Sequence, residues 1–510
     1  MRVLQWIALL LAALLLTACG KDKPTPETPS ASVMIQLSDK AVTVDGKPAS
    51  TDENSAVYTA HDIVYYEEGK DFTYDEGDAQ DAHSAEEAAA HTVVHITKAG
   101  TYTLSGTLSR GQIAVDLGDG AKKDDKAVVT LVLDNADITC EVAPAVIFYN
   151  VYECGSDDEE SATKDVDTTK AGANVVLADG SVNTVRGSYV ARIYDPETVE
   201  LNEAQTEVED AEKLHKYDAA FYSKRSMNVG GSGTLNIHAE NEGMDSELHL
   251  TVNGGKINIF SGNDGINTNE DNVSVTTING GEVTIRVTGE TGEGDGIDSN
   301  GWLVINGGKV IAAACATSAD AGIDSDKGIH INGGTVIATG SMLDRIEDGG
   351  QNYAVFNFAK KQSGSETVVL KNESGSAVME HTPENAYSVL VYSSPELKAG
   401  TYTLHSGDTQ MVGQSGSFGG GFGGFGKPEG APPEGFTPPE GNEPPERPEG
   451  GERPTPPDGF TPPEGMERPD RPNGERPSMP NGGAAQESSD VFIIVDGGNT
   501  FSGVTAKAEN

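Results

Sequence analysis

The chain has 510 residues, which is long enough for one large domain or two ordinary ones. Its 80 Asp and Glu residues against 35 Lys and Arg residues give a formal net charge of −45. Nucleic-acid binders need basic patches that displace counterions from phosphates, so this charge excludes that class of protein. It favours a solvated extracellular protein, or one that holds multivalent cations.

The first residues predict export and a lipid anchor. Arg2 precedes an apolar run over residues 6–16, which is too short to span a bilayer and is typical of a signal-peptide core. The run ends in Leu-Thr-Ala-Cys at 16–19, which resembles the lipobox of bacterial lipoproteins. That resemblance implies a signal peptide over 1–18 and lipid attachment to Cys19. The alternative is an ordinary signal peptide followed by a chance cysteine.

Residues 19–32 are expected to be a lipidated tether, since residues 20–30 hold three prolines and no core residue. The expected location is the extracellular face of the cell membrane, with the lipid as the sole membrane contact. After Cys19 only Cys140, Cys154 and Cys315 remain, which is too few for a disulfide framework. A Cys140–Cys154 bridge stays open, and no Cys/His cluster indicates zinc.

Residues 33–412 are expected to form one β domain, because short apolar alternations typical of strands run through them. The early ones lie at 100–108, 113–116, 128–134, 145–148 and 174–177. Acidic insertions between them are expected to be solvated loops. These insertions lie at 67–87, 156–167 and 195–218. In the last insertion, the helical spacing of Leu201, Ala204, Val208 and Ala211 predicts a short helix.

A repeat in the middle of the chain decides the fold class. The tripeptide Asn-Gly-Gly recurs at steps of 26, 27 and 26 residues, at Asn253, Asn279, Asn306 and Asn332. Apolar residues alternate on both sides of each copy, which indicates strands with one buried face. The glycines indicate tight turns that need a positive φ. The four asparagine amides are expected to stack and hydrogen-bond to one another.

Each repeat also carries a Gly-apolar-Asp/Asn-Ser/Thr motif, at 243–246, 265–268, 296–299 and 322–325. Units of 22 to 31 residues with three short strands and three corners predict a right-handed parallel β-helix. Stacked turns bury apolar columns that no single turn can bury alone. A sandwich or a propeller is the alternative, although a propeller needs about 40 residues per blade.

The composition changes at residue 413. Residues 413–487 are rich in Gly and Phe and then hold 17 of the 25 prolines, so they cannot build a packed core. We expect a disordered insertion that acts as a spacer or contacts the cell wall or a protein partner. Strand patterns at 354–358, 367–370 and 388–392 precede it, and residues 488–510 are expected to add a final strand to the β-helix.

Several motifs between residues 90 and 405 resemble a bacterial carbohydrate-binding β-helix family that is related in fold to pectate lyases. They are the segments 100–106, 131–134 and 218–224, and the alternation of Gly-Ile-Asp-Ser with Asn-Gly-Gly. The resemblance implies a calcium-containing β-helix that binds cellulose or acidic pectic polymers without demonstrated cleavage. The Pro-rich and acidic insertions depart from the simplest family pattern and leave open which surface meets the ligand.

Acidic residues follow the period of the repeat. Equivalent residues of successive turns stack about 4.8 Å apart, where two carboxylates repel by about 3.5 kcal/mol at an effective dielectric near 20. Calcium, which takes carboxylate, amide and backbone oxygens, removes that repulsion. The predicted Ca²⁺ ligands are Asp245, Asp264, Asn267, Asn269, Asp295, Asp298, Asp320, Asp324 and Asp326. The alternative is that these side chains cap tight turns by accepting from backbone N–H groups.

Three aromatic residues are candidate sugar contacts. Trp302 alternates with the inward-facing Leu303 and Ile305, so its indole is expected to be exposed and to stack on a sugar ring. Tyr353 and Tyr392 either line a groove or cover the end of the core.

The function that these patterns favour is non-catalytic polysaccharide binding by a surface lipoprotein. A lyase needs a basic residue to take a proton, and no catalytic constellation is visible around Arg225 or Arg286. Paired carboxylates also suit glycoside hydrolases, but here they follow the period of the turns. The first alternative is an adhesin or stalk that binds a protein partner, and the second is a pectate-lyase-like enzyme.

Overall fold

The computed structural model describes residues 32–74, 77, 79–416 and 488–508. In these residues nearly every element is a strand, which confirms an all-β protein. The single α-helix there, α1, spans Ala85–Ala89, and 3-10 turns cover Ala121–Lys123 and Glu159–Ser161. No described helix has the length and apolar character of a membrane span. The predicted signal peptide, Cys19 and the Pro-rich run lie outside the described residues.

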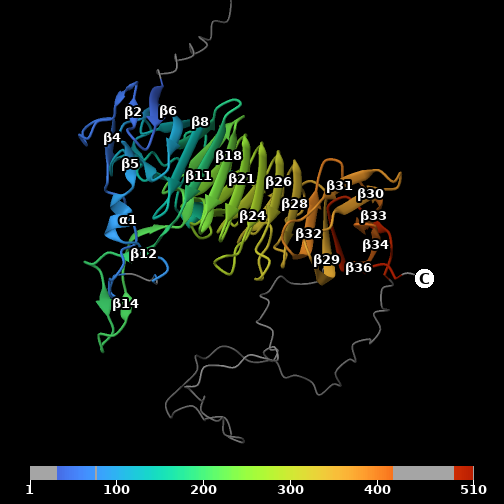
Figure 1. Cartoon of the computed structure of the whole chain (residues 1–510). Helices are drawn as coiled ribbons and strands as arrows, with labels where there is room; N and C mark the ends of the chain where they lie inside the picture. Colours follow the sequence, from blue (N-terminus) through green and yellow to red (C-terminus); the bar gives the residue numbers. More distant parts are fainter. Residues whose placement is uncertain (1–31, 75–76, 78, 417–487, 509–510) are drawn as a thin grey trace, which may run out of the picture. The chain divides into compact units, whose positions relative to one another are not determined.

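Three stacks of parallel strands carry the repeat (Figure 1). Stack 1 consists of β8 (Val129–Cys140), β10 (Ala173–Leu177), β17 (Met227–Gly231), β20 (His249–Val252), β23 (Val275–Ile278), β25 (Trp302–Ile305) and β27 (Gly328–Ile331). Stack 2 consists of the second half of β8 with β11 (Val182–Gly187), β18 (Thr234–Ala239), β21 (Lys256–Ser261), β24 (Glu282–Val287), β26 (Lys309–Ala313) and β28 (Thr335–Gly340). Stack 3 consists of β5 (Thr92–Ile96), β7 (Gly111–Val115), β9 (Val146–Phe148), β16 (Ala219–Ser223), β19 (Glu242–Ser246) and β22 (Ile266–Thr268).

Successive turns align residue upon residue. Val252, Ile278, Ile305 and Ile331 are consecutive register partners in stack 1, and Ile257, Val283, Val310 and Val336 are consecutive partners in stack 2. All eight side chains are buried in one apolar core. The predicted strands with one buried face are therefore confirmed, and they build the expected columns of Ile and Val.

The Asn-Gly-Gly corners explain how the turns approach so closely. The second glycine takes a positive φ, for example 77° at Gly308. A Cβ atom on Gly308 would lie 2.7 Å from the carbonyl oxygen of Gly281 in the preceding turn, so a side chain does not fit. Beside these glycines, Asn279 donates to Asn253 at 2.9 Å, Asn306 to Asn279 at 2.9 Å and Asn332 to Asn306 at 2.8 Å. The predicted column of amides is thereby confirmed.

The chain before the first turns is less regular. β1 (Val33–Leu37) runs parallel to β6 (Gly100–Leu108), which also pairs with β8. The short strands β2 (Thr43–Val44) and β3 (Lys47–Pro48) and the strand β4 (Val57–Ala60) pair antiparallel at this end.

The acidic insertion at 195–218 forms strands where a helix was predicted. β12 (Val190–Tyr194) pairs antiparallel with β15 (Lys213–Tyr217), and β13 (Glu200–Leu201) pairs antiparallel with β14 (Val208–Asp210). The helix prediction is wrong because Leu201 and Val208 face each other across a hairpin. Cross-strand pairing outweighs the weak helical spacing of four apolar residues.

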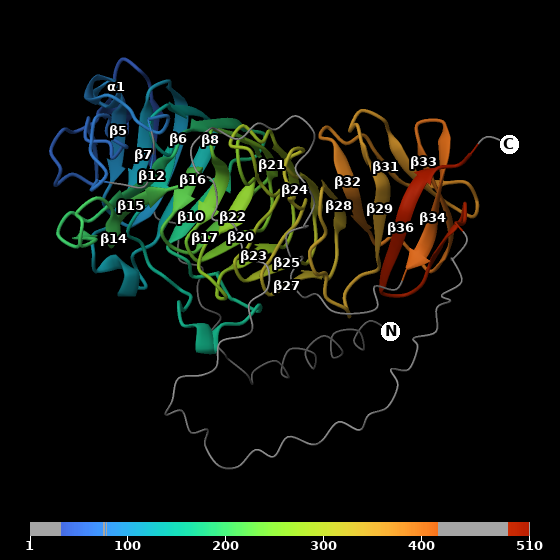
Figure 2. The same ribbon diagram turned by 90° about the horizontal axis from the view of Figure 1, so that it is seen from below.

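The far end of the domain changes to largely antiparallel pairing (Figure 2). It consists of β29 (Tyr353–Gln362), β30 (Val368–Asn372), β31 (Ala377–His381), β32 (Tyr387–Ser393), β33 (Gly400–Ser406), β34 (Thr409–Gly416), β35 (Phe492–Ile494) and β36 (Gly498–Ala506). β32 pairs antiparallel with β28, whereas β36 pairs parallel with β29. A second apolar core forms here around Phe356, Phe492 and Phe501.

Three cysteines and one backbone contact near the C-terminus bear on the remaining predictions. Cys140, Cys154 and Cys315 are free thiols, so the Cys140–Cys154 bridge that the sequence left open does not form. Gly413 and Ser489 exchange two backbone hydrogen bonds of 2.9 and 2.8 Å, which joins the chain on the two sides of residues 417–487.

Candidate functional site

Stack 3 and its continuation bring the predicted acidic residues into line. Asp245 in β19 is the register partner of Asn267 in β22, and the Ile266–Ile297 bridge places Asp298 in the next turn. The Asp324 N–H then donates to the Ile297 carbonyl at 2.7 Å. The predicted alignment is confirmed. We define the acidic column as Asp245, Asn267, Asp298 and Asp324, together with Glu242, Asp264 and Asp295, which precede the motif glycines.

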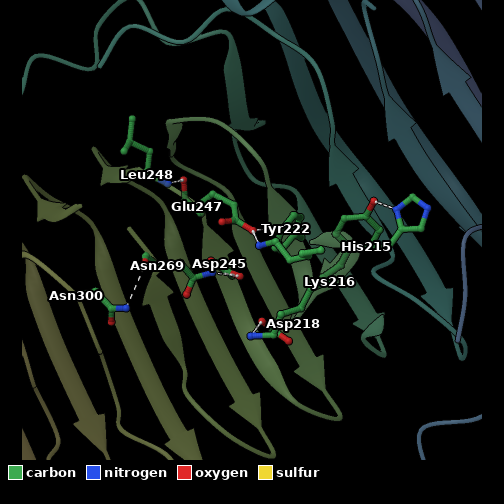
Figure 3. A network of polar contacts seen from close by, with 12 residues as sticks. His215, Lys216, Asp218, Tyr222, Asp245, Glu247, Leu248, Asn269 and Asn300 are labelled. Atoms are coloured by element: carbon green, nitrogen blue, oxygen red, sulfur yellow. Dashed lines mark hydrogen bonds and ion pairs between the residues drawn. The ribbon is translucent and has the colours of Figure 1, made fainter. Parts of the chain in front are cut away.

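The most buried part of this column lies at Glu242 and Asp245, which are 5% and 0% exposed. Asn269 donates to both carboxylate oxygens of Asp245 at 3.1 and 3.0 Å, and Asn267 donates to Glu242 Oε1 at 3.1 Å. Asp218, one turn earlier, is also buried and pairs with Lys216 at 2.8 Å (Figure 3). This end of the column therefore concentrates three carboxylates away from water.

Burial is the main cause of the electrostatic strain at Glu242 and Asp245. It raises the pKa of both carboxyl groups well above the usual range, and neighbouring carboxylates raise the two pKa values further. Glu242 Oε2 and Asn267 Oδ1 are buried without a hydrogen-bond partner. Leaving such an atom unpaired costs about 1–3 kcal/mol, and more for a charged group. These two oxygens therefore fit a cation or a proton.

Farther along the column, the carboxyl groups of Asp264, Asp295, Asp298 and Asp324 are also strained. Burial, followed by repulsion from nearby aspartates, raises their pKa values to about 7, 9, 6 and 7. Some of these groups cap turns, as the alternative interpretation holds. Asp264 accepts from the Asp295 N–H at 2.6 Å, and Asp295 accepts from the Ala321 N–H at 2.5 Å.

Two more predicted ligands, Asp320 and Asp326, contribute less to the column. Asp320 accepts from the Gly294 N–H at 2.7 Å, so it also caps a turn. Asp326 is exposed. Asp324, by contrast, keeps Oδ1 buried with no hydrogen-bond partner. Turn capping therefore accounts for Asp264, Asp295 and Asp320 but leaves Asp324 unexplained.

The donor set decides which cation the column can accept. Among the described residues, no three His, Cys, Asp or Glu side chains converge as a metal-binding group. A cation here would have to use amide and backbone oxygens beside the carboxylates, which is the donor set that calcium prefers. Glu242 Oε2 and Asn267 Oδ1 supply one carboxylate and one amide oxygen of this kind.

Two adjoining cavities open near Asp218 and Asp245. The column cavity, of about 350 Å³, is lined by Lys213, Lys216, Asp218, Glu247, Asn269, Glu270, Asp271 and Asn300. The second, which we name the Lys224 cavity, has about 270 Å³ and shares Lys213, Glu247 and Glu270 with the first. Glu247, which lines both cavities, accepts from the Tyr222 hydroxyl (Figure 3) and pairs with Lys213 at 3.3 Å.

The predicted aromatic contacts do not form one groove. Trp302 is half-buried, and Lys327 Nζ lies 4.8 Å from its ring centre, so a cation covers one face of the indole. Tyr353 packs against the core of the turns. Tyr392 is 1% exposed in the second core, and its hydroxyl donates to the Val378 carbonyl at 2.5 Å. The prediction of Tyr392 as a sugar contact is wrong, because its ring fills the end of the core.

Comparison with known proteins places this architecture in a family. The family described as "carbohydrate-binding domain-containing protein" matches residues 90–409, which include the three stacks and the whole acidic column. The chain belongs to this carbohydrate-binding domain family. The match also includes both cavities, since every residue that lines them falls within these limits.

Two known proteins are similar to part of this chain. A carbohydrate-binding domain-containing protein of Acetivibrio thermocellus is 31% identical over 168 residues, which are 32% of this chain and 44% of the relative. The matched region thus spans less than half the length of that curated relative. A solved structure described as a polysaccharide lyase-like protein from C. thermocellum, as a gadolinium derivative, is 19% identical, with a TM-score of 0.35 over 61% of this chain and 91% of that chain.

The sequence patterns did not assign four important residues to the site. Glu242 stands directly before a motif glycine, as Asp264 and Asp295 do, so the repeat itself held the signal for it. Asp218 and Lys224 lie in the segment 218–224 that carries the family resemblance, and Arg225 follows it, but the spacing of the repeat does not single them out because the regular repeats begin later.

Proposed function

We propose that this chain is a non-catalytic surface lipoprotein that binds polysaccharide on a calcium-stabilised, right-handed parallel β-helix. Membership of the carbohydrate-binding domain family supports a carbohydrate ligand. The single observation that carries the calcium part is the pair of buried oxygens without partners, Glu242 Oε2 and Asn267 Oδ1, beside the buried Asp245. The N-terminal pattern that ends in Cys19 supports a lipid anchor on the extracellular face of the membrane.

The three parallel stacks support the β-helix. Strands of one stack follow each other through crossovers that visit the other stacks, and such crossovers between parallel strands are right-handed in nearly all proteins. Stacked turns present a long surface that matches an extended polymer such as cellulose or an acidic pectic chain.

Calcium would have a structural role in this proposal. An ion at Glu242, Asp245 and Asn267 would neutralise carboxylates that the stacking of turns holds close together. Near the column cavity it would also offer a positive charge to sugar carboxylates. The remaining predicted ligands of the column, from Asp264 to Asp326, would bind further ions where turn capping leaves an oxygen free.

A polymer pull-down tests the proposed function. The full-length protein is mixed with cellulose or with polygalacturonate, with calcium or with EDTA, and the bound fraction is measured. We expect at least one polymer to retain the protein, with retention of polygalacturonate reduced by EDTA. Retention of neither polymer would favour an adhesin that binds a protein partner. Ultraviolet absorbance from unsaturated products would instead identify a lyase.

A further inference from the structure

The Lys224 cavity is the strongest feature of the structure that the acidic column does not explain. Beyond the three residues it shares with the column cavity, it is lined by Lys122, Glu153, Asp157, Lys224, Arg225 and Leu248. Its volume of about 270 Å³ lies just below the range of about 300–1,000 Å³ that holds drug-sized ligands. It therefore suits a ligand of about one sugar unit.

The acidic groups of this cavity are largely engaged by the protein itself. Asp157 pairs with Lys122 at 3.0 Å, and Glu247 pairs with Lys213 at 3.3 Å. Glu153 accepts from the N–H groups of Ser226 and Gly155, both at 2.8 Å. Three of the four lining carboxylates thus have partners, and the fourth belongs to the exposed Glu270.

Two of the basic groups, by contrast, lack anionic partners. Among the described residues neither Lys224 nor Arg225 forms an ion pair, although acidic residues outnumber basic ones by 80 to 35 in the whole chain. The Arg225 Nε–H is buried without an acceptor. A buried donor without an acceptor is costly, so an unpaired guanidinium at a cavity wall indicates a ligand that accepts hydrogen bonds.

The fold holds the backbone of both residues in place. The Lys224 N–H donates to the Phe148 carbonyl at 2.9 Å, while the Ser223 hydroxyl donates to the Arg225 carbonyl at 2.6 Å. Lys224 Nζ lies 5.4 Å from the ring centre of Tyr217, whose ring is buried. Burial lowers the pKa of the Lys224 ammonium, against the attraction of Glu247. A bound anion would restore the solvation that this ammonium has lost.

We propose that the Lys224 cavity is a subsite for the carboxylate of an acidic sugar unit, bound by the Lys224 ammonium and the Arg225 guanidinium. This inference rests on the proposed function, because the acidic sugar is one unit of the bound polysaccharide. A carboxylate matches the fork of donors that a guanidinium presents and accepts charge-assisted bonds from both groups. A neutral sugar leaves both charges unpaired. Unlike the acidic column, the subsite needs no calcium.

Calorimetric titration of the full-length protein with an oligogalacturonate in EDTA tests the subsite. Lys224→Gln and Arg225→Gln should each raise Kd about tenfold or more, because each removes one charge-assisted bond. Lys123→Gln is the matched control, since Lys123 is exposed in the neighbouring 3-10 turn and does not line the cavity. The control should leave Kd unchanged. The methyl ester of the oligomer, which keeps the shape and loses the charge, should bind the wild type about as weakly as the acid binds Lys224→Gln.

Lys224→Arg keeps the charge and should keep Kd within about threefold. Unchanged melting temperatures of the two glutamine variants show that these variants are folded. If wild type and Lys224→Gln bind the acid equally, or the ester binds as well as the acid, the subsite is wrong while polymer retention still supports the proposed function. Inorganic phosphate that binds where the oligomer does not would also overturn the subsite. Loss of all polymer retention by the wild type would overturn the proposed function itself.

Discussion

The acidic column and the Lys224 cavity lie side by side, yet the fold leaves opposite groups unpaired in them. In the column, oxygens of Glu242, Asn267 and Asp324 are buried without donors. In the cavity, the Arg225 Nε–H is buried without an acceptor, and Lys224 has no anionic partner. The column strains the protein from within because its carboxylates repel one another, whereas the cavity offers two cations toward an open space. This difference is the reason why we propose a structural cation for the first site and an anionic ligand for the second.

Removal of calcium should have the largest effect, and it should act on the column. At pH 8, EDTA should lower the free energy of unfolding by about 3 kcal/mol or more, because at least one pair of stacked carboxylates loses its cation. Thermal unfolding with EDTA, followed by added Ca²⁺, measures the loss and its reversal. Equal melting temperatures with and without EDTA would count against a structural calcium ion.

Neutral isosteres in the column should reverse that loss. In EDTA, Glu242→Gln combined with Asp245→Asn should stabilise the protein by about 2 kcal/mol, because the amides keep the shape and remove the repulsion. Chemical denaturation in EDTA provides the measurement. Glu290→Gln, at an exposed position outside the column, is the control and should change stability by less than about 0.5 kcal/mol. A destabilised double variant would show that these carboxylates stabilise the fold without a cation.

The pH dependence should also separate the two sites. The folded pKa values of about 6 to 9 in the column lie above the unfolded values near 4, so the folded state binds more protons. In EDTA, stability should therefore be highest below about pH 4 to 5 as far as these groups contribute, and should fall as the pH rises to 9. Melting temperatures from pH 5 to 9 measure this slope. Calcium should flatten it, and a slope of the opposite sign would contradict the assignment.

Substitution in the Lys224 cavity should have the smallest effect on stability. Lys224→Gln should change the free energy of unfolding by less than about 1 kcal/mol, because no carboxylate loses a partner. Chemical denaturation at pH 7 without ligand measures it. A loss above about 2 kcal/mol would show that Lys224 stabilises the fold, and the contrast between the two sites would disappear.

The periodic part of the structure was predictable from the sequence, whereas the parts that depend on distant contacts were not. The asparagine column and the alignment of Asp245 with Asn267 follow directly from the spacing of the repeat. The prediction of Tyr392 as a sugar contact failed because no sequence pattern indicates that β32 and β36 build a second core. The predicted helix near Leu201 failed because the hairpin register depends on pairing across the turn, which four apolar positions do not specify.

The Lys224 cavity shows the same limit at the functional site. Lys122, Asp157 and Lys224 come from turns far apart in the sequence, and the pairing of β9 with β16 helps to bring these turns together. Neither spacing nor composition indicates which of their charges pair with each other. The two charges that remain unpaired are therefore visible in the structure alone.

Calcium titration of the metal-free protein tests the central claim most directly, namely that stacked turns turn acidic positions into a cation site. Calorimetry on the wild type and on the Glu242→Gln, Asp245→Asn double variant compares the two. We expect the wild type to bind Ca²⁺ and the double variant to lose at least one ion, or to bind it more than tenfold more weakly. A wild type that takes up no calcium, or a double variant with the same stoichiometry and affinity, would contradict the account.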